Sequence, residues 1–356
     1  MLLIGIGLAR AASAQETPPG STPTTNDTPS IRVGATIFAN YTYQTEPKIV
    51  DGEGHSVNRS AFDITRAYIN VTGSISHIVA FRITPDVARE TNAASSNSGS
   101  LELRIKYAYL QVNLDDWMPK DSYARFGIQQ TPYLDYTEGI YRYRFQGTMF
   151  VERANYLSSA DAGASFHWSL PSNYGDVHVG VFNGENFNRL EINDQKAFMF
   201  RASVRPFTRM APILRGLRAT VFYDGDNYVE SADRTRTIGQ VTFEHAHAVA
   251  GFEYLRAKDR MTAARAVTES HGYSIWLTPR FAAGWEGLVR YDHLTPNTIA
   301  ALDSQKRNRT IVGVAYWFPH QGNVSTALML DYDAESFKNL SGLPTKSVAV
   351  HALVNF

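Results

Sequence analysis

Arginine recurs on the polar face of alternating segments of this chain, and guanidinium groups placed in this way could recognise oxyanions. In one segment Met199, Arg201, Ser203 and Arg205 alternate with Phe198, Phe200, Ala202 and Val204. A guanidinium presents a planar fork of N–H donors that fits carboxylate and phosphate oxygens. An arginine that faces lipid near the bilayer midplane costs about 2–4 kcal/mol. If the apolar file faces lipid, the arginine file must face water.

Further basic residues lie on polar files of this kind and are our predicted pore-lining cations. The strands contribute Arg32, Arg66, Arg82, Lys106, Arg125, Arg201, Arg205, Arg218, Arg236, Arg290 and Arg309. The same files carry the acidic residues Asp86, Asp161, Glu244, Glu253, Glu286, Asp292 and Asp331. Rings of basic side chains select anions. The charges could instead pair along the wall and only keep the interior hydrated, and both interpretations stay open.

Catalytic and metal-binding patterns are not found. The chain contains no GKS/T phosphate loop, no G-x-S-x-G elbow and no H-E-x-x-H pair. It has no cysteine, which excludes thiol catalysis, thiolate metal sites and disulfides. His245 and His247 share a predicted turn without further ligands, and Asp224 starts a turn rather than a calcium loop. We therefore expect no enzyme, no metal and no cofactor.

Apolar and polar residues alternate with a period of two in these segments. This period predicts β-strands, because alternate residues of a strand point to opposite faces. It predicts about sixteen strands, at 31–43, 60–74, 77–86, 101–114, 123–130, 160–170, 177–183, 196–205, 217–224, 234–244, 248–256, 271–278, 285–293, 308–318, 324–332 and 346–356. Long connections follow the odd-numbered strands, at 44–59, 87–100, 131–159, 184–195, 225–233, 257–270, 294–307 and 333–345. Mostly short turns follow the even-numbered ones. This alternation is typical of a bacterial outer-membrane barrel.

Aromatic residues support a barrel in contact with outer-membrane lipid, because Trp and Tyr gather at membrane interfaces. Strands that run outward end on Tyr41, Tyr43, Tyr223, Tyr291 and Tyr332, and the opposite ends carry Trp168, Phe243, Trp285, Tyr316, Phe318 and Phe356. An open sheet would leave unpaired edges in lipid, so the strands should close. Outside the N-terminus no apolar run approaches the length of a membrane helix. The net charge of zero gives no reason to expect nucleic acid.

We expect targeting signals at the two ends of the given sequence. Residues 1–14 are apolar and end in Ala12-Ser13-Ala14, which predicts a signal peptide. Residues 15–30 are polar and rich in Pro and Thr, so we expect a flexible leader before a barrel domain at 31–356. The last strand has apolar residues at every second position back from Phe356. It resembles the signal that the barrel assembly machinery recognises, and it should pair with the strand beginning at Ile31.

The connection 131–159 is the longest and most aromatic one, and it predicts a loop folded into the barrel. A barrel of about sixteen strands is too wide for its side chains to fill. Seven aromatic residues of the connection could pack against the inner wall: Tyr133, Tyr136, Tyr141, Tyr143, Phe145, Phe150 and Tyr156. Its charged residues Asp135, Glu138, Arg142, Arg144, Glu152 and Arg153 would then line the constriction. The alternative is a loop that packs only on neighbouring protomers.

The segment from Arg125 to Phe166 resembles the phosphate-selective porin O and P family. The resemblance rests on R-x-G-x-Q from Arg125, Thr-Pro-Tyr at 131–133, F-V-E-R at 150–153 and D-A-G at 161–163. It implies a sixteen-stranded trimeric porin whose third long loop narrows the pore. Phosphate-specific members resemble one another in a lysine-rich lining, whereas this chain has only eight lysines. The resemblance therefore implies anion preference more strongly than phosphate specificity.

These observations favour a passive porin of the bacterial outer membrane, through which small hydrophilic solutes diffuse with a modest preference for phosphate-like anions. One alternative is a barrel without a transport role, such as an adhesin or scaffold. A barrel enzyme such as an outer-membrane phospholipase is a further alternative, and it would need a Ser and a His together at the lipid-facing rim.

Overall fold

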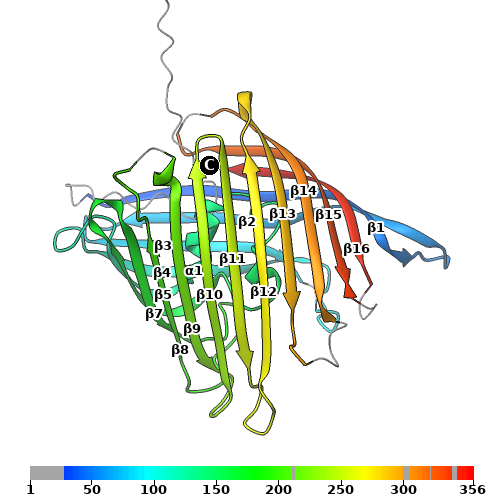
Figure 1. Cartoon of the computed structure of the whole chain (residues 1–356), viewed down its shortest axis with the longest axis horizontal. Coiled ribbons are helices and arrows are strands. Elements are labelled where there is room, and N and C mark those ends of the chain that lie inside the picture. The colour runs from blue at the N-terminus through cyan, green and yellow to red at the C-terminus, as the bar shows by residue number, and fades with distance from the viewer. Residues whose placement is uncertain (1–27, 91, 211–212, 300–304, 321, 339–342) are drawn as a thin grey trace, which may run out of the picture.

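Sixteen antiparallel strands in the described part of the chain close into one barrel, which confirms the predicted fold class (Figure 1). The computed structural model describes residues 28–90, 92–210, 213–299, 305–320, 322–338 and 343–356. The predicted signal peptide, 1–14, and residues 15–27 of the predicted leader lie outside these ranges. Within them, no helix is long and apolar enough to cross a membrane.

The strands follow one another around the barrel in sequence order, and β1 pairs with β16. Their bounds are β1 (Ser30–Val50), β2 (Ser56–Ser74), β3 (Val79–Arg89), β4 (Leu101–Asn113), β5 (Tyr123–Gln130), β6 (Ala160–Ser169), β7 (Gly175–Phe182), β8 (Ala197–Val204), β9 (Leu217–Asn227), β10 (Asp233–His245), β11 (Ala248–Asp259), β12 (Thr268–Pro279), β13 (Trp285–Thr295), β14 (Arg307–Trp317), β15 (Ser325–Phe337) and β16 (Thr345–Asn355). The helices are α1 (Pro132–Ile140) and α2 (Phe150–Arg153), with short 3-10 turns η1 (Pro171–Asn173), η2 (Leu214–Gly216) and η3 (Ala282–Gly284).

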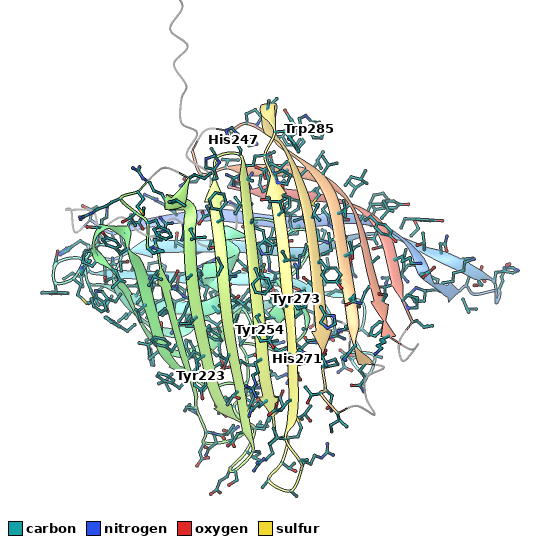
Figure 2. The ribbon with its side chains drawn as sticks, viewed as in Figure 1. Tyr223, His247, Tyr254, His271, Tyr273 and Trp285 are labelled. Carbon is teal, nitrogen blue, oxygen red and sulfur yellow. The ribbon has the colours of Figure 1, made fainter. Side chains whose placement is uncertain are left out.

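The two faces of each strand differ as the alternation predicts. On β8, Phe198 and Val204 are exposed on the outside, whereas Arg201 and Ser203 are buried on the inside. The aromatic residues near the two ends of the strands also form two separate groups. Figure 2 shows Tyr223, Tyr254 and Tyr273 in the half of the wall that carries the long connections, and His247 and Trp285 at the opposite rim. The long-connection end is therefore the extracellular one, and the short-turn end is the periplasmic one.

The predicted long loop 44–59 is wrong, because β1 and β2 continue through most of it. The strands stay paired as far as Val50 and Ser56, after a register shift between Gln44 and Ile49. The bulge interrupts the alternation just after residue 43, where the predicted strand ends. The turn is confined to residues 51–55, where the Asp51 carboxylate accepts the backbone N–H of His55 at 2.8 Å.

Candidate functional site

The connection between β5 and β6 lies inside the barrel, and α1 forms its first half. Pro132 occupies the first position of α1. A backbone N–H at this position would have no intrahelical acceptor, so proline, which lacks one, is well tolerated there. The Pro132 carbonyl accepts Arg201 Nε of β8 at 2.9 Å. The Tyr133 hydroxyl donates to Glu253 of β11, and Thr137 contacts Gln240 of β10. Figure 1 shows α1 behind these front strands, on their inner side.

The second half of the connection reaches β13 and β15. The Glu286 carboxylate accepts Arg142 Nη2 at 2.8 Å and the Tyr143 hydroxyl at 2.9 Å. Gln146 Nε2 donates to Asp331 at 2.8 Å. Arg290 Nη1 donates to the Thr148 carbonyl at 3.1 Å. A segment that starts at β5 and bonds to inward side chains on β8, β11, β13 and β15 has to cross the lumen.

Aromatic packing supports the same placement. Tyr133, Tyr141 and Tyr143 are completely buried. The Tyr141 ring lies 5.1 Å from that of Trp276, and the Tyr143 ring lies 5.8 Å from that of Trp317. Aromatic pairs at such separations stabilise by about 0.5–1.5 kcal/mol beyond their buried area. Tyr141 and Tyr143 therefore pack on the β12–β14 part of the inner wall, whereas the Tyr133 ring packs on Phe222 of β9.

Several charged residues of the connection form ion pairs, and two of them, Glu138 and Arg144, are buried. Arg144 Nε donates to Glu138 at 2.8 Å, and both side chains are almost fully buried. Glu152 also contacts Arg144, at 3.3 Å. Arg153 approaches Asp333 of β15 at 3.9 Å. Burial, together with the neighbouring Arg290 and Arg309, lowers the pKa of Arg153 to about 10, so its guanidinium remains charged at neutral pH.

Most of the predicted pore-lining arginines form ion pairs with carboxylates. The pairs are Arg66 with Asp86, Arg125 with Asp135, Arg201 with Asp176, Arg218 with Glu244, Arg236 with Asp259, Arg290 with Asp292 and Arg309 with Asp333. Asp176, Asp259 and Asp333 were missing from the predicted acidic set because they lie at strand ends or outside the predicted strands. Arg32 lies near the start of β1, where its side chain is exposed.

The inner wall of β2–β5 carries basic side chains in contact with aromatic rings. We call this the basic wall: Arg66, Arg82, Arg104, Lys106 and Arg125. Asp86 accepts both Arg66 and Arg104. Arg125 lies over the rings of Tyr109 and Tyr123, at 4.8 Å and 4.1 Å. Sequence reasoning missed Arg104, although it alternates with the outward residues Leu103 and Ile105 and could have been found.

Two members of the basic wall donate to neutral groups. Arg82 donates to Thr84 at 2.9 Å and to Asn70 at 2.8 Å, and its guanidinium lies 4.4 Å from the centre of the Tyr107 ring. Lys106 donates to the Tyr68 hydroxyl at 2.9 Å. The neighbours named for Arg82 are neutral, so they do not cancel its charge. The wall can therefore contribute a positive potential to the lumen.

Cavities lie on both sides of the inward segment. A cavity of about 720 Å³ on the periplasmic side is lined by Asp135, Arg201, Arg205 and Arg218, among others. A smaller one of about 140 Å³, on the extracellular side, is lined by Arg153 and Arg309. The structure thus brings predicted residues together in two groups, and the inward segment separates them.

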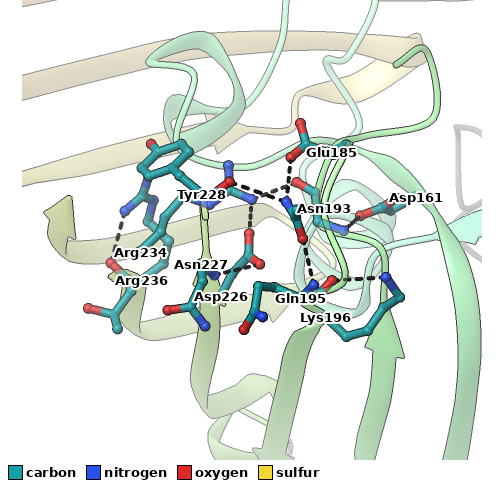
Figure 3. Close-up of polar contacts among 12 residues, drawn as sticks. Asp161, Glu185, Asn193, Gln195, Lys196, Asp226, Asn227, Tyr228, Arg234 and Arg236 are labelled. Atoms are coloured by element: carbon teal, nitrogen blue, oxygen red, sulfur yellow. Dashed lines mark hydrogen bonds and ion pairs between the residues drawn. The ribbon is translucent and has the colours of Figure 1, made fainter. Parts of the chain in front are cut away.

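Asp161 lies outside both groups. Its carboxylate accepts the backbone N–H of Gly184 at 2.8 Å. Next to it, Arg234 bridges the Gly184 carbonyl and the Asp226 carboxylate, and Asn193 donates to the Tyr228 carbonyl at 3.2 Å (Figure 3). Asp161 therefore helps to hold the connection between β7 and β8 against the wall.

In the described part of the chain, a Ser–His pair lies in the lumen and not at the lipid-facing rim. His178 Nε2 lies 3.0 Å from Ser165 Oγ, and Ser165 donates its own hydroxyl to Gln129 at 2.6 Å. In this arrangement the serine accepts from the imidazole, which is the reverse of an activated nucleophile. Among the described residues, no three His, Cys, Asp or Glu side chains are grouped to hold a metal ion.

Comparison with known proteins gives a family and a fold. The family model for phosphate-selective porin O and P matches residues 44–242. The anion-selective porin from Comamonas acidovorans superposes with a TM-score of 0.63 at 11% identity, covering 92% of this chain and 100% of that one. The outer-membrane channel DcaP of Acinetobacter baumannii superposes with a TM-score of 0.57 at 11% identity, covering 92% of this chain and 97% of that one.

A third similar structure is the trimer form of OmpT, an outer-membrane protein of Vibrio cholerae. It superposes with a TM-score of 0.55 at 12% identity, covering 91% of this chain and 99% of that one. At this level of identity the likeness to these structures concerns the fold. No curated protein matches the chain.

Proposed function

Because the chain belongs to the phosphate-selective porin O and P family, we propose that it lets small hydrophilic solutes diffuse across the bacterial outer membrane with a preference for anions. It is a passive outer-membrane porin, with a closed barrel that presents apolar side chains to lipid and charged ones to the lumen. The finer part of the proposal concerns which solutes pass and where they are selected.

The observation that carries the anion preference is the basic wall. Arg82 is buried and donates to the neutral side chains of Thr84 and Asn70, so it acts on a passing ion through its field. A unit charge about 8 Å away through water contributes about 0.5 kcal/mol, which is about a twofold change in ion concentration. The ion pairs elsewhere along the lumen contribute less because their charges offset one another.

The segment 131–159 is the proposed constriction. It bonds to four strands across the lumen and separates the two cavities. A solute has to pass between this segment and the wall. The segment is fixed at both halves, so it acts as a static filter.

We also propose that the porin is a homotrimer, like the trimer form of OmpT. Phe62, Leu103 and Phe126 protrude from the outer face of β2, β4 and β5, with 66–84% of their surface exposed. A contact between protomers through this face would cover them. Chemical cross-linking of the detergent-solubilised protein tests the assembly, and a species no larger than a dimer would contradict it.

The selectivity is tested by the reversal potential of reconstituted channels under a potassium chloride gradient. We expect anion preference in the native protein. In Arg82→Gln the chloride-to-potassium permeability ratio should be about fourfold lower, because chloride becomes about twofold less concentrated and potassium about twofold more concentrated near the wall. Arg256→Gln is the matched control, because it removes one cation from the outward face of β11. Cation selectivity of the native channel would contradict the anion preference.

Two further results would overturn the wider proposal. Correctly folded protein that inserts into bilayers without conductance would favour an adhesin or scaffold. The porin family and fold favour a channel over an enzyme, and we propose that the protein has no catalytic role. If the protein hydrolysed lipid and lost this activity when His178 was replaced, that proposal would be contradicted. In each case, heat-modifiable migration on gels shows whether the variant has formed its barrel.

A further inference from the structure

The connection between β7 and β8, residues 183–196, reaches from its own strands to the basic wall. The Phe187 backbone N–H donates to the Ala160 carbonyl of β6 at 3.2 Å. The Phe187 ring lies 5.1 Å from the Arg104 guanidinium and packs against the buried cluster that includes Tyr107. Because this connection lies at the extracellular end, its position affects how much of the basic wall a solute meets on entering.

Gly184 is the residue at which two side chains of the wall hold this connection. Its backbone N–H donates to the Asp161 carboxylate at 2.8 Å. Its carbonyl accepts the Arg234 guanidinium, which also pairs with Asp226 (Figure 3). A Cβ atom at Gly184 would lie 2.7 Å from the Asp226 carboxylate, so that carboxylate lies directly against the connection. Two carboxylates and one guanidinium therefore surround Gly184.

Asp224 lies beside this cluster. It is two residues before Asp226 on β9, so both side chains point into the lumen, and 4% of the Asp224 surface is exposed. In the described part of the chain, Asp224 Oδ1 is buried without a hydrogen-bond donor, and Arg234 Nε is buried without an acceptor. The charged groups that act on Asp224 are Arg234, Asp226, Arg236 and Asp161.

Arg236, the second arginine near Asp224, is engaged elsewhere. It lies opposite Asp224 on β10. Its Nη2 donates to Asp259 of β11 at 2.7 Å, and its Nε donates to the Tyr156 carbonyl of the inward segment at 3.1 Å. Among the charged groups that act on Asp224, this leaves Arg234 as the cation that three carboxylates share.

The remaining elements around Asp224 add no free counter-charge among the residues that the structure describes. β8 presents Met199 opposite Asp224, and the next inward residue of β8, Arg201, is paired with Asp176. The connection itself brings a further carboxylate, Glu185 (Figure 3). A buried carboxylate without a donor or a counter-charge binds a proton more strongly than an exposed one. Asp224 is therefore the member of this cluster that is best placed to hold a proton.

We propose that Asp224 makes the hold on the β7–β8 connection depend on pH, so that the connection is fixed while Asp224 carries a proton and loosens when Asp224 ionises. Neutral Asp224 leaves Arg234 to Asp226 and to the Gly184 carbonyl. Ionised Asp224 repels Asp226 and competes for Arg234 through the unpaired Nε. The connection should therefore become more mobile as pH rises.

The test observes the connection itself and does not depend on conductance. The chain has no cysteine, so a spin label on Leu190→Cys reports this connection alone, and Leu190 is 86% exposed. The mobility of the label in the full-length, detergent-solubilised protein is measured by electron paramagnetic resonance from about pH 5 to about pH 9. Failure of the anion preference would leave this result unaffected, because the label reports the connection and not the current.

We expect the mobile fraction of the label to rise several-fold with pH in the otherwise native protein. Asp224→Asn should keep it low at every pH, because an amide cannot ionise. Arg234→Gln should keep it high at every pH, because the cation that holds Gly184 is lost. Glu269→Gln is the control: it removes a carboxylate from the outer surface, where Glu269 contacts Arg256 and Lys258, and should titrate like the native protein.

Three results would overturn the proposal. The first is a label whose mobility does not change with pH in the otherwise native protein. The second is a pH dependence that persists in Asp224→Asn. The third is a pH dependence that Asp161→Asn abolishes and Asp224→Asn does not, because the proton would then be held by the other carboxylate. Heat-modifiable migration on gels shows that each variant has formed its barrel.

Discussion

At the scale of single residues, the charged lumen is organised around carboxylates that several cations share. Asp86 forms ion pairs with Arg66 and Arg104, and Asp333 forms ion pairs with Arg153 and Arg309. A buried carboxylate is stable only when charged or hydrogen-bonding partners replace its lost hydration. Sharing gives each of these carboxylates two cationic partners, so pairing along the wall occurs at these positions. Anion selection by excess charge at the basic wall stays a proposal.

Glu286 offers a test of one shared carboxylate. It accepts Arg142 and Tyr143 of the inward segment and also contacts Arg280 at 3.2 Å. In Glu286→Gln the two guanidinium groups lose their counter-charge, and removing one partner of a buried pair costs about 3 kcal/mol. We expect the second half of the inward segment to loosen, seen as more frequent partial closures in single-channel records and closure at lower voltage.

Glu269→Gln is the matched control for this change. Its carboxylate also bridges two basic side chains, Arg256 and Lys258, but on the outer surface. The control should record like the native channel. Glu286→Gln traces that cannot be told apart from native ones would mean that the remaining contacts alone fix the segment.

At the scale of elements, the strands could be predicted but their partners inside the lumen could not. Alternation predicts strands because one face meets lipid and the other meets water, so the pattern is present in each strand by itself. The end of β1 was missed, since a bulge hides the continuation past Gln44. The bonds from Tyr133 to Glu253 and from Gln146 to Asp331 depend on barrel width and loop path, and neither is encoded by local spacing.

Close strand approach at Gly127 gives a prediction for β5. This residue has φ of +125°, and a Cβ atom there would lie 2.3 Å from the Ala108 carbonyl oxygen of β4. Gly127→Ala should therefore destabilise the barrel by about 2 kcal/mol, from backbone strain and displacement of the neighbouring strand. The measurement is the temperature or urea concentration at which the folded gel band is lost.

Gly239→Ala on β10 serves as the control, because its added Cβ would meet no atom within 4 Å. It should unfold like the native barrel. If Gly127→Ala matches it, β4 and β5 can separate at this point without cost, and the close approach is not required.

At the scale of the whole molecule, closure depends on the last strand pairing with the first. The predicted pairing is confirmed: β16 lies antiparallel to β1, with Val350 opposite Tyr41 and Val354 opposite Ile37. At the seam, the Phe356 backbone exchanges two hydrogen bonds of 3.0 Å with Ala35. The Phe356 side chain itself is 61% exposed at the periplasmic rim. Its ring therefore adds little packing to the finished barrel, whereas its backbone completes the ladder.

This separation between ring and backbone predicts that Phe356→Ala affects assembly in cells and not the finished channel. The variant keeps both backbone bonds to Ala35 but removes the aromatic end that resembles the assembly signal. We expect several-fold less folded protein in the outer membrane, while protein refolded in detergent has native heat stability and conductance. Phe281→Ala is the control, because this rim aromatic is equally exposed, at 62%, and lies outside the last strand. If both variants accumulate normally, the terminal ring has no role in recognition. If refolded Phe356→Ala is unstable, the ring contributes to closure itself, and its exposure in the monomer must be lost in the assembled protein.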